Sequence, residues 1–338
     1  MRRLLLSVVV AALPSLTQAE PSDTIIESVV THHILSGFSN LADQTASFEA
    51  TAQKDCTPSS EALRDGYGRA FDAWVYVSHL RFGPTEVGDR AFALAFWPDS
   101  RGATPRTLAT LIAQQDPVAA SAETYADVSI AGRGFYAMEF LLFDAATIES
   151  ADPEYFCTLV QAVAADIAAN SAAIAQDWAT DYADKVLNPT PEGTYRSDEE
   201  VLQELFKALS TGLEFTSDTR LGRPLGTYDN PRPSRAEAWR SARSARHVAL
   251  SLNSLRDLAL RLSAGDDALN ARLARGFDKA NAQLDALDDP AFAGVADPQR
   301  RLRIEVVQQS VDAIRGTVRD ALGPTLGVAS GFNALDGD

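Results

Sequence analysis

Apolar residues recur at every third or fourth position along nearly all of this 338-residue chain. Such spacing places one apolar stripe on each helix, and that stripe must pack against other helices. No alternating pattern of the kind that predicts β-strands reaches a convincing length. We therefore predict an all-α protein made of two helical halves of similar size packed together. One of the clearest helical patterns is formed by Ile26, Val29, Val30, Ile34, Phe38 and Leu41.

A short segment near the middle of the chain predicts the boundary between the halves. Residues 188–193 read Asn-Pro-Thr-Pro-Glu-Gly, and two prolines with a glycine end a helix and favour a loop. We predict an N-terminal helical bundle over residues 20–190 and a C-terminal one over residues 191–338. In the second half, Ser234 and Glu237 have the spacing of a capping box, which predicts a helix from there to about Ala264.

The N-terminus has the pattern of a secretory signal peptide over residues 1–19. Two arginines precede an apolar run, and the segment ends on the small residue Ala19. No later stretch has the uninterrupted apolar length of a transmembrane segment, so we predict an exported, periplasmic protein. Without residues 1–19, 30 − 2 = 28 basic residues face 46 acidic ones. A surface this acidic argues against nucleic acid as a partner.

Cys56 and Cys157 are the only cysteines. An oxidising compartment favours a disulfide between them, which would close a loop of about a hundred residues. Two buried free thiols are the alternative.

An acidic residue lies in the middle of an apolar run. Residues 132–143 read Gly-Arg-Gly-Phe-Tyr-Ala-Met-Glu-Phe-Leu-Leu-Phe, and an ionised Glu139 there is costly without a partner. Tyr136, one helical turn earlier, shares its face. Their oxygens suit a hard cation such as ferric iron or calcium, although a third ligand would be needed. Alternatively, Tyr136 packs between helices and Glu139 pairs with an arginine.

The second half carries a cluster of arginines in an otherwise acidic chain: Arg232, Arg235, Arg240, Arg243 and Arg246. A guanidinium can hold a carboxylate with two parallel hydrogen bonds. We predict that Arg240, Ser241 and Ser244 face Tyr136 and Glu139 across a polar cleft. A solvent-exposed helix face with charge pairs one turn apart is the alternative.

Histidines are few, and no His-Glu-x-x-His motif of a zinc peptidase occurs. We predict that His32 and His33 lie on a solvated helix face. For His247, a position on the protein surface and a position in a binding site are equally plausible predictions. His79, close to Arg81, is a candidate for a binding site, with core packing as the alternative.

The segment from Gly134 to Glu139 resembles the Gly-x-His-x-x-Glu signature of the imelysin family, with Tyr136 where the signature has His. Other stretches resemble imelysin landmarks in the same order, and together they cover most of the mature chain. They are Cys56 with Pro58, Trp74, and residues 79–84, 96–102, 237–244 and 331–338.

This resemblance implies two four-helix-bundle-like halves with the signature near their junction. It also implies an exported protein connected with iron regulation or uptake, in a family classed among peptidases because one member was described as insulin-cleaving. Because the signature histidine is replaced, we predict a ligand-binding protein without zinc peptidase activity. The predicted ligand is a small molecule or a metal ion, and iron or another hard cation is the only cofactor candidate.

An imelysin-type metallopeptidase and a structural partner in an envelope complex remain the alternatives, and envelope iron-uptake proteins are candidate partners. No catalytic residue is predicted. The predicted metal ligands are Tyr136 and Glu139, and the predicted ligand-binding residues are Tyr136, Glu139, Arg240, Ser241, Ser244, Glu237, His79 and Arg81.

Overall fold

The computed structural model describes residues 22–328. The predicted signal peptide and the motif at residues 331–338 lie outside the described residues. Helices dominate the part that is described, and it contains no β-strand, only an isolated bridge between Thr227 and Asn230. The prediction of an all-α protein is therefore confirmed.

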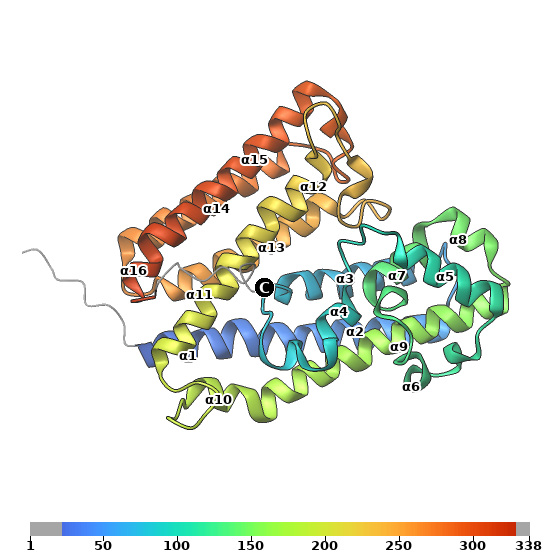
Figure 1. Cartoon of the computed structure of the whole chain (residues 1–338), viewed down its shortest axis with the longest axis horizontal. Coiled ribbons are helices and arrows are strands. Elements are labelled where there is room, and N and C mark those ends of the chain that lie inside the picture. Colours follow the sequence, from blue (N-terminus) through green and yellow to red (C-terminus); the bar gives the residue numbers. More distant parts are fainter. Residues whose placement is uncertain (1–21, 329–338) are drawn as a thin grey trace, which may run out of the picture.

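Four helices form the first group, in blue to green at the bottom of Figure 1. Helix α2 (Ser36–Lys54) packs along both α3 (Glu61–Val77) and α9 (Pro153–Asp177), and α7 (Gly134–Phe143) packs on α9 and α3. Their apolar stripes meet in a core rich in aromatic rings, and the fully buried members include Phe38, Phe48, Tyr67, Phe71, Phe135 and Trp178.

The second group, in yellow to red, lies alongside the first in Figure 1. Helix α13 (Ser244–Leu262) packs against α11 (Asp198–Glu214) and α14 (Asp267–Asp285), and α15 (Pro298–Thr317) packs on α14 and α11. Because α13 also packs on α3, it forms much of the junction between the two groups. The division of the chain at residue 190 stays a prediction.

Shorter helices complete the described chain. Helix α1 (Ser22–Val29) packs on α11 and α13 and continues into α2 through a π-helical turn, Val30–Leu35. A second π-helical turn, Phe215–Leu221, extends α11. The others are α4 (Arg90–Leu94), α5 (Ala103–Gln114), α6 (Ala122–Tyr125), α8 (Ala145–Ser150), α10 (Ala183–Leu187), α12 (Gly222–Leu225) and α16 (Gly323–Thr325).

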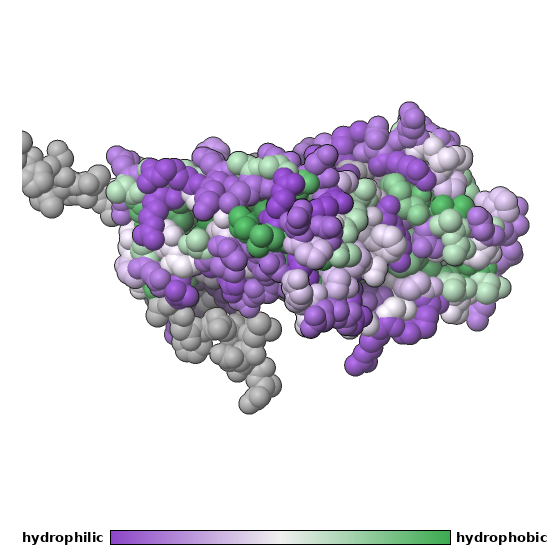
Figure 2. Space-filling model, turned by 90° about the horizontal axis from the view of Figure 1, so that it is seen from above, coloured by the Kyte–Doolittle hydropathy of each residue, from purple (hydrophilic) through white to green (hydrophobic). Residues whose placement is uncertain are grey.

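The continuous helical segment Pro153–Leu187, which contains α9, is long and apolar enough to cross a membrane by length and composition alone. Asp152 caps its N-terminus by accepting hydrogen bonds from the backbone of Glu154 and Tyr155, and Pro153 occupies the first helical position. More than half of its most apolar window, 56%, is buried inside the protein. Its hydrophobicity is thus that of a core helix. On the face in Figure 2, hydrophilic residues surround small, separate groups of hydrophobic ones.

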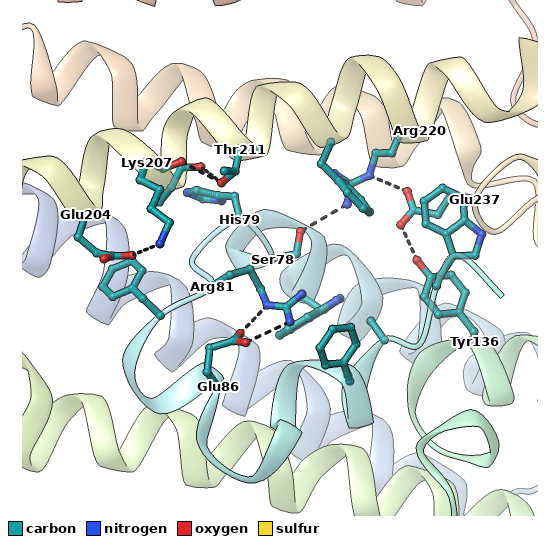
Figure 3. Close-up of a pocket in the computed structure, with 18 residues that line it drawn as sticks. Ser78, His79, Arg81, Glu86, Tyr136, Glu204, Lys207, Thr211, Arg220 and Glu237 are labelled. Carbon is teal, nitrogen blue, oxygen red and sulfur yellow. Dashed lines mark hydrogen bonds and ion pairs between the residues drawn. The ribbon is translucent and has the colours of Figure 1, made fainter. Parts of the chain in front are cut away.

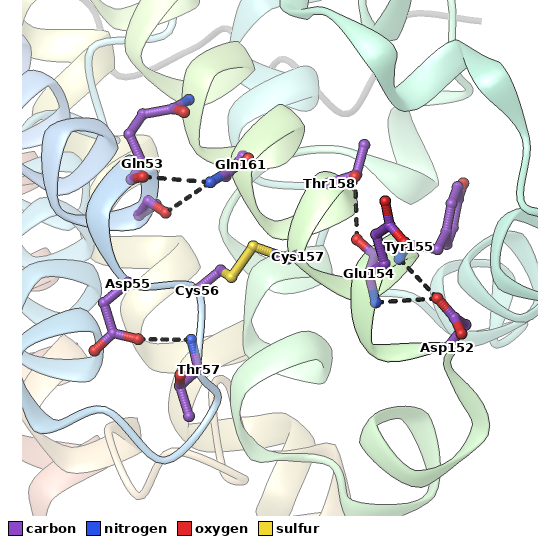
Figure 4. The surroundings of a disulfide bond; sticks show 11 residues. Gln53, Asp55, Cys56, Thr57, Asp152, Glu154, Tyr155, Cys157, Thr158 and Gln161 are labelled. Atoms are coloured by element: carbon purple, nitrogen blue, oxygen red, sulfur yellow. Dashed lines mark hydrogen bonds between the residues drawn. A yellow bond between two sulfur atoms is a disulfide. The ribbon is translucent and has the colours of Figure 1, made fainter.

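The two cysteines are joined. Cys56, in the loop after α2, forms a disulfide with Cys157 on α9, and their Cα atoms lie 5.1 Å apart (Figure 4). Beside it, the Gln161 side chain donates a hydrogen bond to the Ala52 carbonyl at the end of α2. The predicted disulfide is therefore confirmed, and it ties the loop after α2 to the first turns of α9.

The helix predicted to begin at Ser234 is wrong in its N-terminal part. A 3-10 turn, Pro233–Arg235, is followed by an irregular segment, and α13 begins only at Ser244. Ala238 and Ala242 have φ angles of 48° and 54°. This left-handed conformation interrupts a right-handed helix and is unfavourable for alanine. The contacts that Glu237 and Ser241 make with α7 hold the chain in this shape.

Candidate functional site

A cavity of about 570 Å³ lies between the two groups of helices (Figure 3). One wall is formed by α11 and the π-helical turn after it, and the other by the end of α3 and residues 78–97. Its volume is within the range of small-molecule binding sites. Much of its lining is aromatic, from Trp74, Phe82, Phe92, Trp97, Tyr136 and Phe215.

The loop and helix that present the signature residues depend on a glycine. Gly134, the first residue of α7, has a φ of 73°, and a Cβ atom there would collide with the carbonyls of Ala93 and Leu94. Only glycine meets both conditions without strain. It lets α7 begin directly against the C-terminal end of α4, which places Tyr136 in the wall of the cavity.

Glu237 is the centre of a buried ionic network at one end of the cavity (Figure 3). Its Oε1 accepts a hydrogen bond from the Tyr136 hydroxyl at 2.5 Å, and its Oε2 accepts one from Arg220 Nε at 2.6 Å. Glu237 and Arg220 are 2% and 4% exposed. Burial alone would raise the pKa of Glu237, but Arg220, His247 and Tyr136 outweigh it and hold this pKa below its usual value. Glu237 is therefore ionised at neutral pH.

Glu139 is as deeply buried as Glu237 but has different partners. Its Oε1 accepts hydrogen bonds from the backbone nitrogen and the hydroxyl of Ser241, at 2.9 and 2.8 Å. Both donors are uncharged. Burial raises the pKa of Glu139 more than Ser241 and the nearby Arg240 lower it. The neighbours of Glu139 therefore offset only part of the free-energy cost of burying its negative charge.

The predicted approach of the two motif-bearing stretches is present in the structure. Ser241 donates hydrogen bonds to Glu139, and Tyr136 donates one to Glu237. The Ser244 hydroxyl instead donates to the Glu237 backbone carbonyl of its own stretch, at 2.6 Å. Arg240 does not reach Glu139. Its Nε lies 3.3 Å from Asp144 Oδ2, and its guanidinium stacks 3.8 Å from the centre of the Phe140 ring. Whether these residues bind a ligand stays a prediction.

Two other arginines of the cluster connect the two groups of helices elsewhere. Arg243 and Arg246 both form ion pairs with Asp72 of α3, and Arg243 also donates to the Gly68 carbonyl.

Arg81, a predicted binding residue outside this cluster, forms an ion pair with Glu86 at 2.5 Å and lies over the ring of Phe92, in the wall of the cavity.

The prediction that His33 lies on a solvated face is wrong, whereas His32 is exposed. His33 is 1% exposed, its Nδ1 lies 2.8 Å from Asp257 Oδ2, and its Nε2 lies 3.0 Å from Nε2 of His79. His33 lies four residues after Val29 and three after Val30, which are both buried, so ordinary helical spacing places it on the same inward face. His79 lines the cavity, and burial together with His33 lowers its pKa well below the usual value. Burial alone would raise the pKa of Asp257, but hydrogen bonds from His33 and Arg261 outweigh it and hold this pKa at about 2.

Two residues of the site were not predicted to belong to it. Arg220 lies in a segment without a recognisable motif, and its buried contact with Glu237 reveals its role. His247, left open between surface and site, is fully buried. Its Nδ1 is 3.3 Å from Glu237 Oε2, and its ring meets Phe71 edge-to-face. The position of His247 on the inward face of α13 is the sequence feature that could have predicted its burial.

Tyr136, one of the two predicted metal ligands, does not fit a hard cation in this arrangement. The Tyr136 hydroxyl donates a hydrogen bond to Glu237. Burial and, after it, the charge of Glu237 raise the pKa of Tyr136 well above its usual value. Arg220 already supplies the positive charge beside Glu237. Over residues 22–328, no group of three or more His, Cys, Asp or Glu side chains is placed to hold a metal ion.

Comparison with known proteins identifies the family. The family model named Imelysin (Peptidase_M75) matches residues 34–318. An imelysin-like protein from Psychrobacter arcticum 273-4 has a similar structure, with a TM-score of 0.77 and 21% sequence identity. That match covers 96% of this chain and 100% of the other. A putative iron-regulated protein A precursor from Parabacteroides distasonis ATCC 8503 aligns with a TM-score of 0.73 and 13% identity, over 88% of this chain and 94% of the other.

No curated protein matches the sequence. The two solved structures share the fold at low identity, and the family model covers most of the chain, including the segments that carry Tyr136, Glu139 and Glu237. This chain belongs to the imelysin family.

Proposed function

We propose that this chain is an exported protein that binds a small, largely apolar ligand in the cavity between its two groups of helices. The observation that carries the proposal is the cavity itself, about 570 Å³ in volume, aromatic along much of its wall. The ionic network of Glu237, Arg220 and Tyr136 at its end offers polar groups that orient a ligand. Apolar walls with a few fixed polar groups are typical of small-molecule sites.

The proposed relation to iron rests on names alone. A structural neighbour is described as a putative iron-regulated protein A precursor. Because the Tyr136 hydroxyl is hydrogen-bonded to Glu237 and Glu139 Oε1 is held by Ser241, the proposed ligand is a molecule and not a bare metal ion.

Absence of zinc peptidase activity is part of the proposal. A catalytic zinc site needs about three protein ligands and an open position for water. Here Tyr136 replaces the signature histidine and is hydrogen-bonded to Glu237. We expect that protein stripped with a chelator and supplied with zinc cleaves casein no faster than its Glu139→Ala variant. Chelator-sensitive cleavage that Glu139→Ala abolishes would contradict this part.

Export is supported by the disulfide, because such bonds persist in oxidising compartments. We propose the periplasm as that compartment. Cell fractionation with alkylation of free thiols tests it. We expect a periplasmic protein in which Cys56 and Cys157 resist alkylation until they are reduced. A cytoplasmic protein with two reactive thiols would contradict the proposal.

Binding is tested with N-phenyl-1-naphthylamine, an uncharged apolar dye whose fluorescence rises when it is buried. The decisive variant is Thr211→Trp, which adds a large side chain to the α11 wall of the cavity. The control is Gln203→Trp on the same helix, at a position that does not line the cavity.

We expect saturable binding to the wild type and to the control, and an affinity lower by about tenfold or more for Thr211→Trp because the cavity is filled. Absence of saturable binding to the wild type, or equal affinity for all three proteins, would contradict the proposed site.

A further inference from the structure

A second, smaller cavity lies on the other side of Tyr136 and Trp97. Its volume is about 200 Å³, and both aromatic residues line it as well as the larger cavity. Their rings are stacked with centroids 6.2 Å apart, so the pair forms a partition between the two spaces. The rest of the wall comes from residues 96–105, from α7 and from residues 234–240.

Three arginines line this small cavity, and two of them have no acidic partner. Over residues 22–328, Arg223 and Arg235 form no ion pair, and the buried Nε of Arg223 makes no hydrogen bond. Arg240 binds Asp144 through Nε alone. Its guanidinium is held between the rings of Phe140 and Trp239, at 3.8 and 4.6 Å from their centres, which fixes its orientation.

The two acidic residues of the same wall form no ion pair with Arg223 or Arg235, and their hydrogen bonds go to other groups within residues 22–328. Asp99 accepts hydrogen bonds from the backbone nitrogens of Arg101, Ala103 and Thr104, and so holds the start of α5. Glu139 accepts hydrogen bonds from Ser241. The cavity therefore contains more hydrogen-bond donors than acceptors. Buried donors are normally satisfied, and a guanidinium left with free N–H groups is suited to an oxyanion.

We propose that this cavity is an anion-binding site in which Arg223, Arg235 and Arg240 hold one carboxylate or tetrahedral oxyanion. The chain carries 30 basic against 46 acidic residues, so its overall field repels anions and binding must come from this local group. The volume admits a small anion or the anionic end of a larger molecule. This site does not depend on the ligand proposed for the larger cavity.

Isothermal titration calorimetry with sodium sulfate and, separately, with sodium malonate tests the site and distinguishes the two kinds of anion. Chloride keeps the ionic strength constant, because surface attraction depends on salt. The test variant is Arg223→Gln/Arg235→Gln. The control is Arg272→Gln/Arg275→Gln, which removes the same charge from two exposed positions on α14.

We expect at least one of the anions to bind the wild type with one-to-one stoichiometry. The affinity of Arg223→Gln/Arg235→Gln should fall by about tenfold or more, since a charged hydrogen bond is lost with each arginine. The control should bind as the wild type does. Thr211→Trp should also keep its affinity for the anion, which separates this site from the larger cavity.

Failure of both anions to bind, or equal weakening in both double variants, would overturn the proposal, because the first leaves no site and the second reduces it to overall charge. Thermal unfolding establishes that each variant is folded. Arg235→Gln alone, at an exposed position, provides a second variant, and we expect it to weaken binding in part.

Discussion

Glu139 and Glu237 are two equally buried carboxylates whose pKa values are shifted in opposite directions. Each is 2% exposed, and each connects α7 with the segment before α13. Glu237 has a guanidinium at 2.6 Å, and its pKa is held below the usual value, whereas Glu139 has only the uncharged donors of Ser241, and burial raises its pKa. The charge of the partner, rather than the depth of burial, decides which carboxylate is stably ionised.

This difference separates two roles at the junction. Glu237 links Arg220 after α11 with Tyr136 on α7, and therefore holds elements of both groups of helices. Glu139 lines the small cavity, where an incompletely compensated carboxyl is available to a bound molecule. We infer that Glu237 contributes mainly to stability and Glu139 mainly to the site.

The largest effect is expected for Glu237→Ala. It leaves Arg220 buried without its carboxylate, and breaking a buried ion pair in this way costs about 3–5 kcal/mol. Urea unfolding measures this loss. The control is Asp278→Ala, which breaks an exposed pair with Arg256 and should cost about 0–1 kcal/mol. Equal losses for the two variants would remove the structural role of Glu237.

Tyr136→Phe should have the next largest effect. It deletes the hydroxyl that donates to ionised Glu237, and a hydrogen bond to a charged group contributes about 1.5–3 kcal/mol. Tyr155→Phe is the matched control, because the Tyr155 hydroxyl donates to the uncharged carbonyl of Asp116, with about 0.5–1.5 kcal/mol expected. Urea unfolding of both variants provides the comparison. A smaller loss for Tyr136→Phe than for Tyr155→Phe would contradict the ionised state of Glu237.

Glu139→Gln should change the free energy of unfolding by only about 1 kcal/mol or less, in either direction. Glutamine keeps an oxygen that accepts from Ser241 and removes a charge whose burial is costly. The same urea measurement applies. A loss as large as that of Glu237→Ala would show that the two carboxylates do not differ.

The pH dependence of stability should have opposite signs for the two residues. The folded pKa of Glu237 lies below its reference value of 4.5, so its contribution is present above pH 4.5 and is lost as the pH falls towards the folded pKa. The folded pKa of Glu139 lies above 4.5, so its contribution is present below pH 4.5 and is lost as the pH rises through the folded pKa.

Chemical unfolding of the wild type and of each Glu→Gln variant is measured over a range of pH. The difference between wild type and variant gives, for each residue, the slope of its contribution to the free energy of unfolding against pH. Each slope is at most about 1.4 kcal/mol per pH unit. Slopes of the same sign would contradict the assignment.

The sequence was sufficient for much of the fold. Spacing of apolar residues predicted the helices because a buried stripe determines their faces, as for Val29 and Phe38. The cost of burying Glu139 predicted a partner, and Ser241, in the predicted segment, supplies it. The two cysteines predicted their own bond.

The errors arose where tertiary contacts override local preference. Ala238 and Ala242 favour a helix, yet they adopt left-handed angles in the segment that brings Glu237 and Ser241 to α7. His33 is a different case, because its spacing from the buried Val29 and Val30 already places it on the inward face of the helix. Arg220 became recognisable only through its contact with Glu237.

The most direct test of the difference between the two carboxylates is carbon-13 NMR titration of their side-chain carboxyl groups, assigned with the Glu139→Gln and Glu237→Gln variants. We expect the Glu139 signal to titrate above the usual pKa of a glutamate, and the Glu237 signal to remain that of the ionised form down to acid unfolding. Two ordinary titrations, or the reverse order, would contradict the assignment of Glu237 to stability and Glu139 to the site.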